Sequence, residues 1–288
     1  DLSARLCASL GRPFNLMHYW GPLASGKSSA WIIKALARVM KDPAPDVVFG
    51  YLPHLDYDLQ RHGPEHGKAA AAARSLEGYL AQFIDACAAC GYDHVIYGDY
   101  AIQPVQRGAV FPNRRLVDAG LFRTRTVRGM RYPDFFHYEA FAMVDHELAH
   151  VYVADPAKIE FVRQSFVGMP GVARVWTRAQ AAEVGLDHPN SGELILLAEP
   201  GAWFAYPWWE DRREAPDYAT HIDIHNKPGF DPCELFFGWP PLSVSLDTRR
   251  VGGTHGRSCQ VAWRTSIPTS EHPANLVELG AWIGRQAG

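Results

Sequence analysis

The 288-residue sequence predicts an α/β fold with a parallel-sheet core flanked by helices and an elaborated C-terminal half. Hydrophobic residues make up 47% of the chain and charged residues 20%, an ordinary globular composition with enough apolar material for a sizeable core. In the first hundred residues a short apolar strand, a polar loop, a long helix and a second strand follow one another, which is the order of a βαβ unit. No repeat or low-complexity segment interrupts the chain, so we expect a single domain over residues 1–288.

The N-terminal hundred residues contain the longest predicted helices. Apolar residues at helical spacing predict helices, and short apolar runs that end at Gly or Pro predict strands. These patterns give helices at Asp1–Leu10, Ser28–Met40 and Lys68–Cys90, strands at Phe14–Tyr19, Val47–Leu52 and His94–Tyr97, and a loop from Pro53 to Gly67. Asp56 and Asp99 each follow one of these strands. Because parallel strands end at one edge of a sheet, we expect both carboxylates at a ligand-binding edge.

The C-terminal half is predicted to mix strands with short helices. The patterns give strands at Phe141–Val144, Ala149–Val153, Val172–Thr177 and Glu193–Ala198, and helices at Pro156–Phe166 and Arg178–Val184. An aromatic group follows in a predicted loop: Trp203, Phe204, Tyr206, Trp208 and Trp209. We expect it to form a packed lid, with stacking on a substrate ring as the alternative.

Charge, hydropathy and cysteine content exclude several classes of protein. The formal net charge of −3 and the lack of a basic run argue against nucleic acid as a partner. No stretch approaches eighteen consecutive apolar residues, so we predict a soluble protein without a membrane span. Five scattered cysteines argue against a disulfide framework and favour a reducing, cytoplasmic location. Cys87 and Cys90 form a C-x-x-C at the end of a predicted helix, where packing is favoured over redox or zinc chemistry.

Residues Gly21–Ser28 match the phosphate-loop pattern G-x-x-x-x-G-K-[ST]. Such a loop surrounds an anion with backbone N–H groups, and Pro22 removes one of these donors. No convincing magnesium-binding Asp follows on a later strand. We therefore favour a turn that leads into a helix, and keep nucleotide binding through Lys27 as an alternative.

The segment after Val47–Leu52 is rich in side chains that bind cations. It contains His54, Asp56, Asp58, Gln60 and His62. Carboxylate and imidazole at this density suit a cation such as zinc, and a solvated loop with a helix cap is the plain alternative.

This segment resembles the type I phosphodiesterase/nucleotide pyrophosphatase branch of the alkaline phosphatase superfamily. In that family a strand leads to a metal-binding D-x-x-x-H that is followed, two residues later, by Gly-Pro. Counting back from Gly63-Pro64 aligns Asp56 with the Asp of the family and Gln60 with its His. Asp58 and His62 restore D-x-x-x-H but break the spacing to Gly-Pro, so the first register is preferred.

Three further motifs extend the resemblance. Gly98-Asp99-Tyr100 stands where the family has S-D-H-G, whose Asp and His bind the second metal; Asp99 matches the Asp, and Tyr100 stands in place of the His. The stretch from His225 to Asp231 resembles the H-G-Y-D neighbourhood, and Thr254-His255-Gly256 resembles the late H-G that supplies the last ligand. The implied metal ligands are Asp56, Gln60, Asp99, Tyr100 and His255, with His146, His150 and His225 as additional candidates.

Longer strings point to a little-characterised bacterial subgroup of this family. They are Y-L-P-H-L-D-Y at 51–57, A-H-V-Y-V at 149–153 and, with Phe for Tyr, K-P-G-Y-D-P at 227–232. The resemblance implies an alkaline phosphatase-like domain, two zinc sites and a small phosphorylated substrate of the phosphodiester or nucleotide pyrophosphate type. It also implies covalent attack by a Thr or Ser hydroxyl that lies upstream of these motifs.

We therefore expect the domain to be incomplete at its N-terminus and this chain alone to be hydrolytically incompetent, with its catalytic residue unknown. Gln60 and Tyr100 weaken the two implied metal sites. The alternative is a degenerate pseudoenzyme that keeps the fold as a binding module.

Two histidine pairs have i, i+4 spacing: His146 with His150, and His221 with His225. Each pair would converge on a metal only within a helix. The apolar run after His150 suggests that this residue starts a strand, which favours buried hydrogen-bonding roles for the first pair. The second pair stays open.

Overall fold

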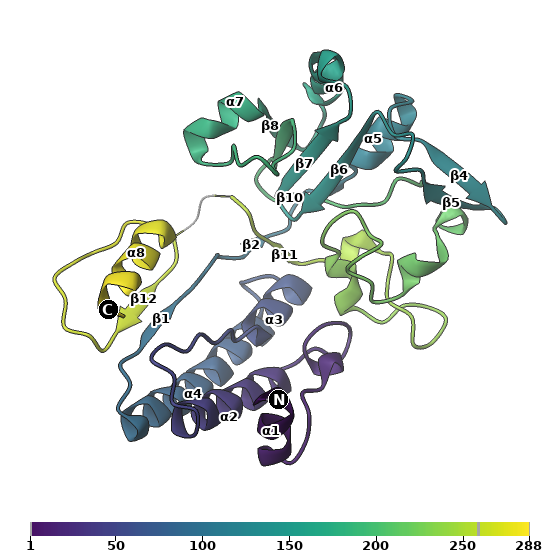
Figure 1. The fold of residues 1–288 in the computed structure, drawn as a ribbon. Coiled ribbons are helices and arrows are strands. Elements are labelled where there is room, and N and C mark those ends of the chain that lie inside the picture. The colour runs from purple at the N-terminus through teal and green to yellow at the C-terminus, as the bar shows by residue number, and fades with distance from the viewer. Residues whose placement is uncertain (1, 258–259, 288) are drawn as a thin grey trace.

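The computed structural model describes residues 2–257 and 260–287 and confirms the α/β class (Figure 1). The longer helices are α1 (Leu2–Ser9), α2 (Lys27–Lys41), α3 (His54–His62), α4 (Gly67–Cys90), α5 (Pro112–Asp118), α6 (Ile159–Phe166), α7 (Arg178–Ala181) and α8 (Leu276–Gln286). The strands are β1 (Val95–Tyr97), β2 (Gln103–Pro104), β3 (Gly108–Val110), β4 (Thr124–Val127), β5 (Met130–Pro133), β6 (Ala140–Asp145), β7 (Leu148–Val153), β8 (Val172–Thr177), β9 (Leu194–Ala198), β10 (Ala202–Phe204), β11 (Gly253–Thr254) and β12 (Trp263–Thr265). Figure 1 shows α1 to α4 grouped together, apart from the sheet that contains β6 and β7.

Helices α2 and α3 pack against the long helix α4. Small residues on α4, Ala69 and Ala72, are buried at this contact and permit a close approach. His54 joins all three helices, because its ring nitrogens bond Ser29 Oγ of α2 at 3.0 Å and the carbonyl of Ala72 at 3.1 Å. Helix α4 ends at Gly91 in the left-handed conformation, as the sequence predicts. This helical layer holds the first turn of α3, with Asp56, in a fixed position.

The largest sheet has the strand order β6-β7-β9-β8, and all of its pairs are antiparallel. Only β3 and β10 pair in parallel among the described strands, so the predicted parallel order does not apply to this sheet. The physical reason is local: only two residues separate β6 from β7, and so short a connection allows only an antiparallel hairpin. The inward-facing residues of this sheet and of α6 form one core cluster.

Three predicted elements differ in the structure. Phe14–Tyr19 contains a short 3₁₀ helix, Leu16–His18, instead of a strand. Val47–Leu52 is neither helix nor strand and pairs with no strand in the described parts of the chain. The predicted loop of residues 53–67 contains α3, which has an acidic residue in its first turn, basic residues in its last turn and Gly63 as its stop.

The aromatic segment is not a lid. Trp203 and Phe204 belong to β10, and the five rings are each at most 4% exposed. They therefore serve as core, which excludes both the lid and direct stacking on a substrate in this arrangement. Cys87 is buried against Met40 in the helical layer, as predicted for a packing residue.

The C-terminal segment returns to the N-terminal half through two strand pairs, β1 with β12 and β2 with β11. Gly253 of β11 lies so close to α3 that a Cβ there would come within 2.3 Å of the Leu59 carbonyl oxygen. This close approach places the residue after β11, His255, beside α3. None of the described helices is long and apolar enough to cross a membrane.

Candidate metal centre

Polar side chains from four separate segments meet beside α3. They are Asp56 and Gln60 of α3, Tyr100 after β1, Asp145 and His146 at the β6–β7 turn, and His255 after β11. Each segment is fixed by a different part of the fold, so the centre depends on the tertiary structure.

Asp56 is held by its neighbour one helical turn later. Gln60 Nε2 donates to Asp56 Oδ2 at 2.6 Å, as the i, i+4 spacing on a helix permits. The Tyr100 hydroxyl approaches the same carboxylate and also lies 3.3 Å from the Tyr51 hydroxyl. Asp56 Oδ1 and Gln60 Oε1 are buried and have no hydrogen-bond partner. Two acceptor oxygens are therefore left free at one point of the centre.

The Asp56 carboxyl has an unusual acidity. Burial raises its pKa to about 6, and the neighbouring carboxylates Asp99 and Asp145 add to the rise, whereas hydrogen bonding from Gln60 lowers it. Burial also raises the pKa of Asp145, although this residue is in part exposed to solvent. None of these three carboxylates takes part in an ion pair with a described Lys or Arg. The centre thus has an excess of negative charge.

His255 lies between two other rings. Its imidazole stacks on Tyr100 with a centroid distance of 4.0 Å, and the His146 ring lies 3.9 Å away on a tilt of 36°. Burial lowers the pKa of His255 to about 4, so the ring is neutral at pH 7. A neutral imidazole is the form that binds a metal.

His146 occupies the β6–β7 turn in the left-handed region, with φ of 51°. Three contacts fix it there: Phe204 N donates to its carbonyl at 2.6 Å, Glu147 N donates to the His255 carbonyl at 2.8 Å, and its Nδ1 lies 3.3 Å from Thr254 Oγ1. The ring is fully buried, and its Nε2 has no partner. Burial lowers the pKa of His146 well below its usual value, with the nearby His255 as a second cause.

Asp145, His146 and His255 offer ligand atoms that all lie within 4.8 Å of one another. A tetrahedral zinc site has ligand atoms about 3.4 Å apart, given bonds of about 2.1 Å. The unpartnered oxygens of Asp56 and Gln60, the unpartnered His146 nitrogen and the uncompensated carboxylates all fit a cation. The donor set therefore suits a divalent metal.

The predicted ligands are distributed unevenly. Asp56, Gln60, Tyr100 and His255 meet in the centre, whereas Asp99 is exposed and its Oδ1 accepts from Tyr100 N at 3.1 Å. The expected shared edge of parallel strands is absent, because Asp56 lies within α3 and β1, which precedes Asp99, pairs antiparallel with β12. Asp99 acts on Asp56 through its charge.

The other two candidate histidines lie outside the centre. His150 is on β7, four residues from His146 and therefore about 13 Å along a strand. Its Nδ1 accepts from Gly192 N at 3.2 Å. His225 is exposed, and its backbone N donates to Asp223 Oδ1 at 2.9 Å. Sequence spacing did not single out Asp145 as a ligand, because a hairpin turn has no fixed ligand spacing and only the Asp-His dipeptide marks it.

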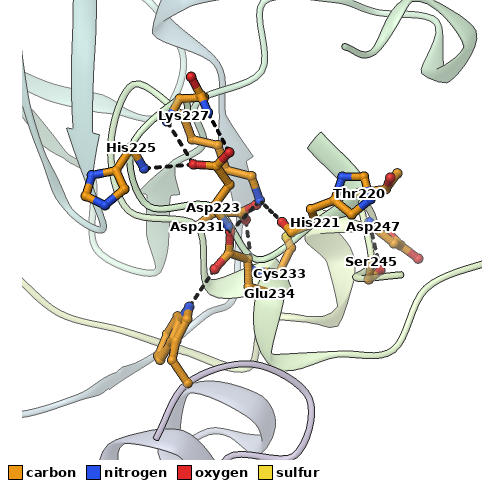
Figure 2. A network of polar contacts seen from close by, with 12 residues as sticks. Thr220, His221, Asp223, His225, Lys227, Asp231, Cys233, Glu234, Ser245 and Asp247 are labelled. Carbon is orange, nitrogen blue, oxygen red and sulfur yellow. Dashed lines mark hydrogen bonds and ion pairs between the residues drawn. The ribbon is translucent and has the colours of Figure 1, made fainter. Parts of the chain in front are cut away.

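A second polar network lies next to the centre (Figure 2). Buried Lys227 Nζ forms ion pairs with Asp231 at 2.9 Å and with Glu234, and donates to the His221 carbonyl at 3.0 Å. Glu234 also accepts from Trp20 Nε1 at 2.6 Å. The segment resembling H-G-Y-D is thus used in an ion-pair network. That network positions Phe230, whose ring lies 4.8 Å from the His146 ring.

Residues Gly21–Ser28 are organised as a turn. The Arg61 guanidinium donates to the carbonyls of Gly21 and Ala24, so carbonyl oxygens face a cation there. Backbone N–H groups of Ala24, Ser25 and Ser28 are used within the turn or with His18. This arrangement differs from a phosphate cradle, which needs free N–H groups.

Comparison with known proteins gives a family match over most of the chain. The profile of the type I phosphodiesterase / nucleotide pyrophosphatase family matches residues 4–231. No curated protein matches the sequence.

Solved structures show weaker similarity. The crystal structure of phosphonoacetate hydrolase from Sinorhizobium meliloti 1021 in complex with phosphonoacetate has 14% identity and a TM-score of 0.49, over 92% of this chain and 56% of that chain. Human ectonucleotide pyrophosphatase / phosphodiesterase 5 has 13% identity and a TM-score of 0.44, over 64% of this chain and 45% of that one. The murine protein has 13% identity and a TM-score of 0.43, over 60% and 43%. The chain therefore spans about half the length of these structures.

Proposed function

The chain belongs to the type I phosphodiesterase / nucleotide pyrophosphatase family, and from this premise we propose that it is part of a metal-dependent phosphoric ester hydrolase. The substrate class is a small phosphodiester or nucleotide pyrophosphate. Residues 1–288 act as one domain in this proposal, because the pairs β1–β12 and β2–β11 tie the C-terminal segment to the N-terminal half.

One observation carries the metal dependence: the centre contains buried oxygen and nitrogen atoms without hydrogen-bond partners, and its carboxylates lack a counter-charge. Asp56 Oδ1 and His146 Nε2 are such atoms. Leaving buried polar groups unpaired costs about 1–3 kcal/mol each, so native proteins usually pair them with protein groups, ordered water or a bound ion. Asp56 and His255 would hold the cation, and Asp99 would add charge from the rim. A bound divalent cation would polarise a phosphoryl oxygen of the substrate.

We also propose that this chain alone does not hydrolyse phosphoric esters. The aliphatic hydroxyl in contact with the centre is that of Thr254, which is fully buried and lies 3.3 Å from His146 Nδ1. A nucleophile must reach the substrate, so Thr254 is a support for the histidine ring and not a candidate for attack. The role of the chain in hydrolysis is to bind the metal and the substrate.

The test is metal content together with hydrolysis. Protein purified and then loaded with zinc should retain about one zinc ion per chain after dialysis, and lose it in His255→Ala. The same protein should leave p-nitrophenyl phosphate and bis(p-nitrophenyl) phosphate unchanged. Zinc-dependent hydrolysis by this chain would contradict the proposed absence of a nucleophile, whereas a chain that takes up no divalent metal would contradict the metal dependence.

A binding module without metal is the second candidate function. Tyr100 favours it, because its ring covers His255 and its hydroxyl lies beside Asp56, where a ligand histidine is expected from the family resemblance. The zinc measurement separates the two candidates, since the module would bind substrate analogues without retaining metal.

A further inference from the structure

We propose that the β6–β7 turn supplies two of the metal ligands, Asp145 and His146, which complete the site with His255. The inference depends on the proposed function for the presence of a cation. It goes further in assigning Asp145, which the sequence did not single out as a ligand, together with His146, which the sequence named only as an additional candidate.

The ligand atoms are already close to the required arrangement. One carboxylate oxygen of Asp145 and one ring nitrogen each of His146 and His255 lie within 4.8 Å of one another. With the proton on Nδ1, His146 donates to Thr254 Oγ1 and leaves the lone pair of Nε2 free. Metal-binding histidines typically use the second nitrogen in this way, which fixes the ring.

Gln60 and Tyr100 are weaker candidates for ligation, although Gln60 Oε1 has no hydrogen-bond partner. Gln60 Nε2 is bonded to Asp56, and the Tyr100 hydroxyl lies with Tyr51 while its ring covers His255. An amide and a neutral phenol are also weaker zinc ligands than imidazole. They are positioning residues for Asp56 and His255, and the turn provides the additional nitrogen.

The turn is held in a strained conformation by contacts with the neighbouring segment that contains Gly229 and Phe230. A histidine with φ of 51° is uncommon, and such backbone strain is typical of ligand-binding sites. Phe230 N donates to the Val144 carbonyl at 2.9 Å, and Phe230 packs its ring on His146. Gly229 makes this approach possible, since a Cβ there would meet the Val144 carbonyl oxygen at 2.0 Å. The fold thus directs His146 inward at a conformational cost.

The charge of the turn points to a cation as well. Burial is the main cause of the raised pKa of Asp56, and repulsion from Asp145 adds to it. Neither carboxylate forms an ion pair with a Lys or Arg among the described residues. Two imidazoles with one or two carboxylates suit zinc among the common divalent ions.

The decisive experiment measures zinc binding by calorimetry on metal-stripped protein, with the zinc ion alone as the probe. Against the unaltered chain, His146→Ala and Asp145→Asn should each lower zinc affinity at least ten-fold. His150→Ala is the matched control on the same hairpin, because its ring bonds Gly192 outside the centre, and it should leave the affinity unchanged. Circular dichroism of each metal-free variant checks folding. Asp145 is exposed to solvent, so Asp145→Asn should disturb the fold least.

Cobalt provides a readout that does not depend on affinity. The visible absorption of the cobalt-loaded chain should change shape in His146→Ala, because one nitrogen ligand is lost, and stay the same in His150→Ala. If His146→Ala and Asp145→Asn bind zinc as the unaltered chain does while His255→Ala fails, the turn is not a ligand and the proposed function stands. If the unaltered chain binds no zinc, the proposed function and this inference both fail.

Discussion

The candidate metal centre and the Lys227 network both bury charged side chains, and they differ in how those charges are satisfied. In the network, Lys227 has two carboxylate partners, and Glu234 also accepts from Trp20 and from Asp223 N. In the centre, Asp56 and His146 each keep a buried atom without a partner. A satisfied network stabilises the fold, whereas unpartnered buried atoms beside carboxylates that lack a counter-charge fit an ordered water or a bound ion. The comparison therefore separates a structural role from a binding role within one part of the molecule.

The largest expected effect is the loss of the buried lysine. Burial alone would lower the pKa of Lys227, but the carboxylates of Asp231 and Glu234 raise it, so the lysine is charged at pH 7. Lys227→Met leaves two buried carboxylates without their cation and should lower the free energy of unfolding by about 3–5 kcal/mol. Urea denaturation measures this loss of unfolding free energy. Lys158→Met is the control, since its pair with Glu139 is partly exposed and should contribute about 1 kcal/mol or less.

The same measurement on the centre should give a smaller effect. His146→Leu removes the unpartnered Nε2 but also the Nδ1 contact with the buried Thr254 hydroxyl, so the metal-free protein should lose about 1–2 kcal/mol, less than Lys227→Met loses. If His146→Leu lost as much unfolding free energy as Lys227→Met, His146 would have a structural role, and the contrast between the two regions would fail.

Zinc should stabilise the unaltered chain through binding to the folded state. At a free zinc concentration one hundred times the dissociation constant, the gain is about 2.7 kcal/mol, seen as a higher melting temperature that a chelator reverses. His255→Ala should abolish the shift, and Lys227→Met should keep it in whatever fraction of the protein still folds. If zinc still raised the melting temperature of His255→Ala, the zinc site would have to lie elsewhere in the chain.

The pH dependence of the metal-free protein sharpens the comparison in a different way. The pKa of Asp56 is raised from 3.8 to about 6, so the folded state binds its proton more tightly and stability falls as pH rises from about 4 to 6. The pKa of His255 is lowered from 6.5 to about 4, so stability rises with pH through the same range. The two trends oppose each other.

Asp56→Asn removes one trend and leaves the other. Its free energy of unfolding should rise between pH 4 and 6.5, whereas that of the unaltered chain changes less, and the two curves should differ by up to about 3 kcal/mol. Urea midpoints at several pH values measure both curves. Parallel curves would show that Asp56 has an ordinary pKa.

The comparison also shows what the sequence could and could not reveal. The i, i+4 spacing of Asp56 and Gln60 predicts a shared position, and the helix that produces it was missed because a His- and Gly-rich composition suggested a loop. Element types with strong periodicity, such as α2 and α4, followed from local patterns. Strand direction did not, because the pairing partner of each strand lies far along the chain. His146 joins the centre through a left-handed turn that only tertiary contacts stabilise.

Lys27 offers the smallest expected effect and contrasts with Lys227. It is exposed at the start of α2, and the turn before it presents carbonyl oxygens to Arg61 in place of free N–H groups. Lys27→Ala should therefore change the free energy of unfolding by less than about 0.5 kcal/mol. Titration with ATP should give the same weak response before and after the substitution, whereas tight ATP binding that Lys27→Ala abolishes would identify residues 21–28 as a phosphate loop. Arg61→Met sharpens the result, because it leaves those carbonyls without their guanidinium and should destabilise the turn far more than the loss of Lys27.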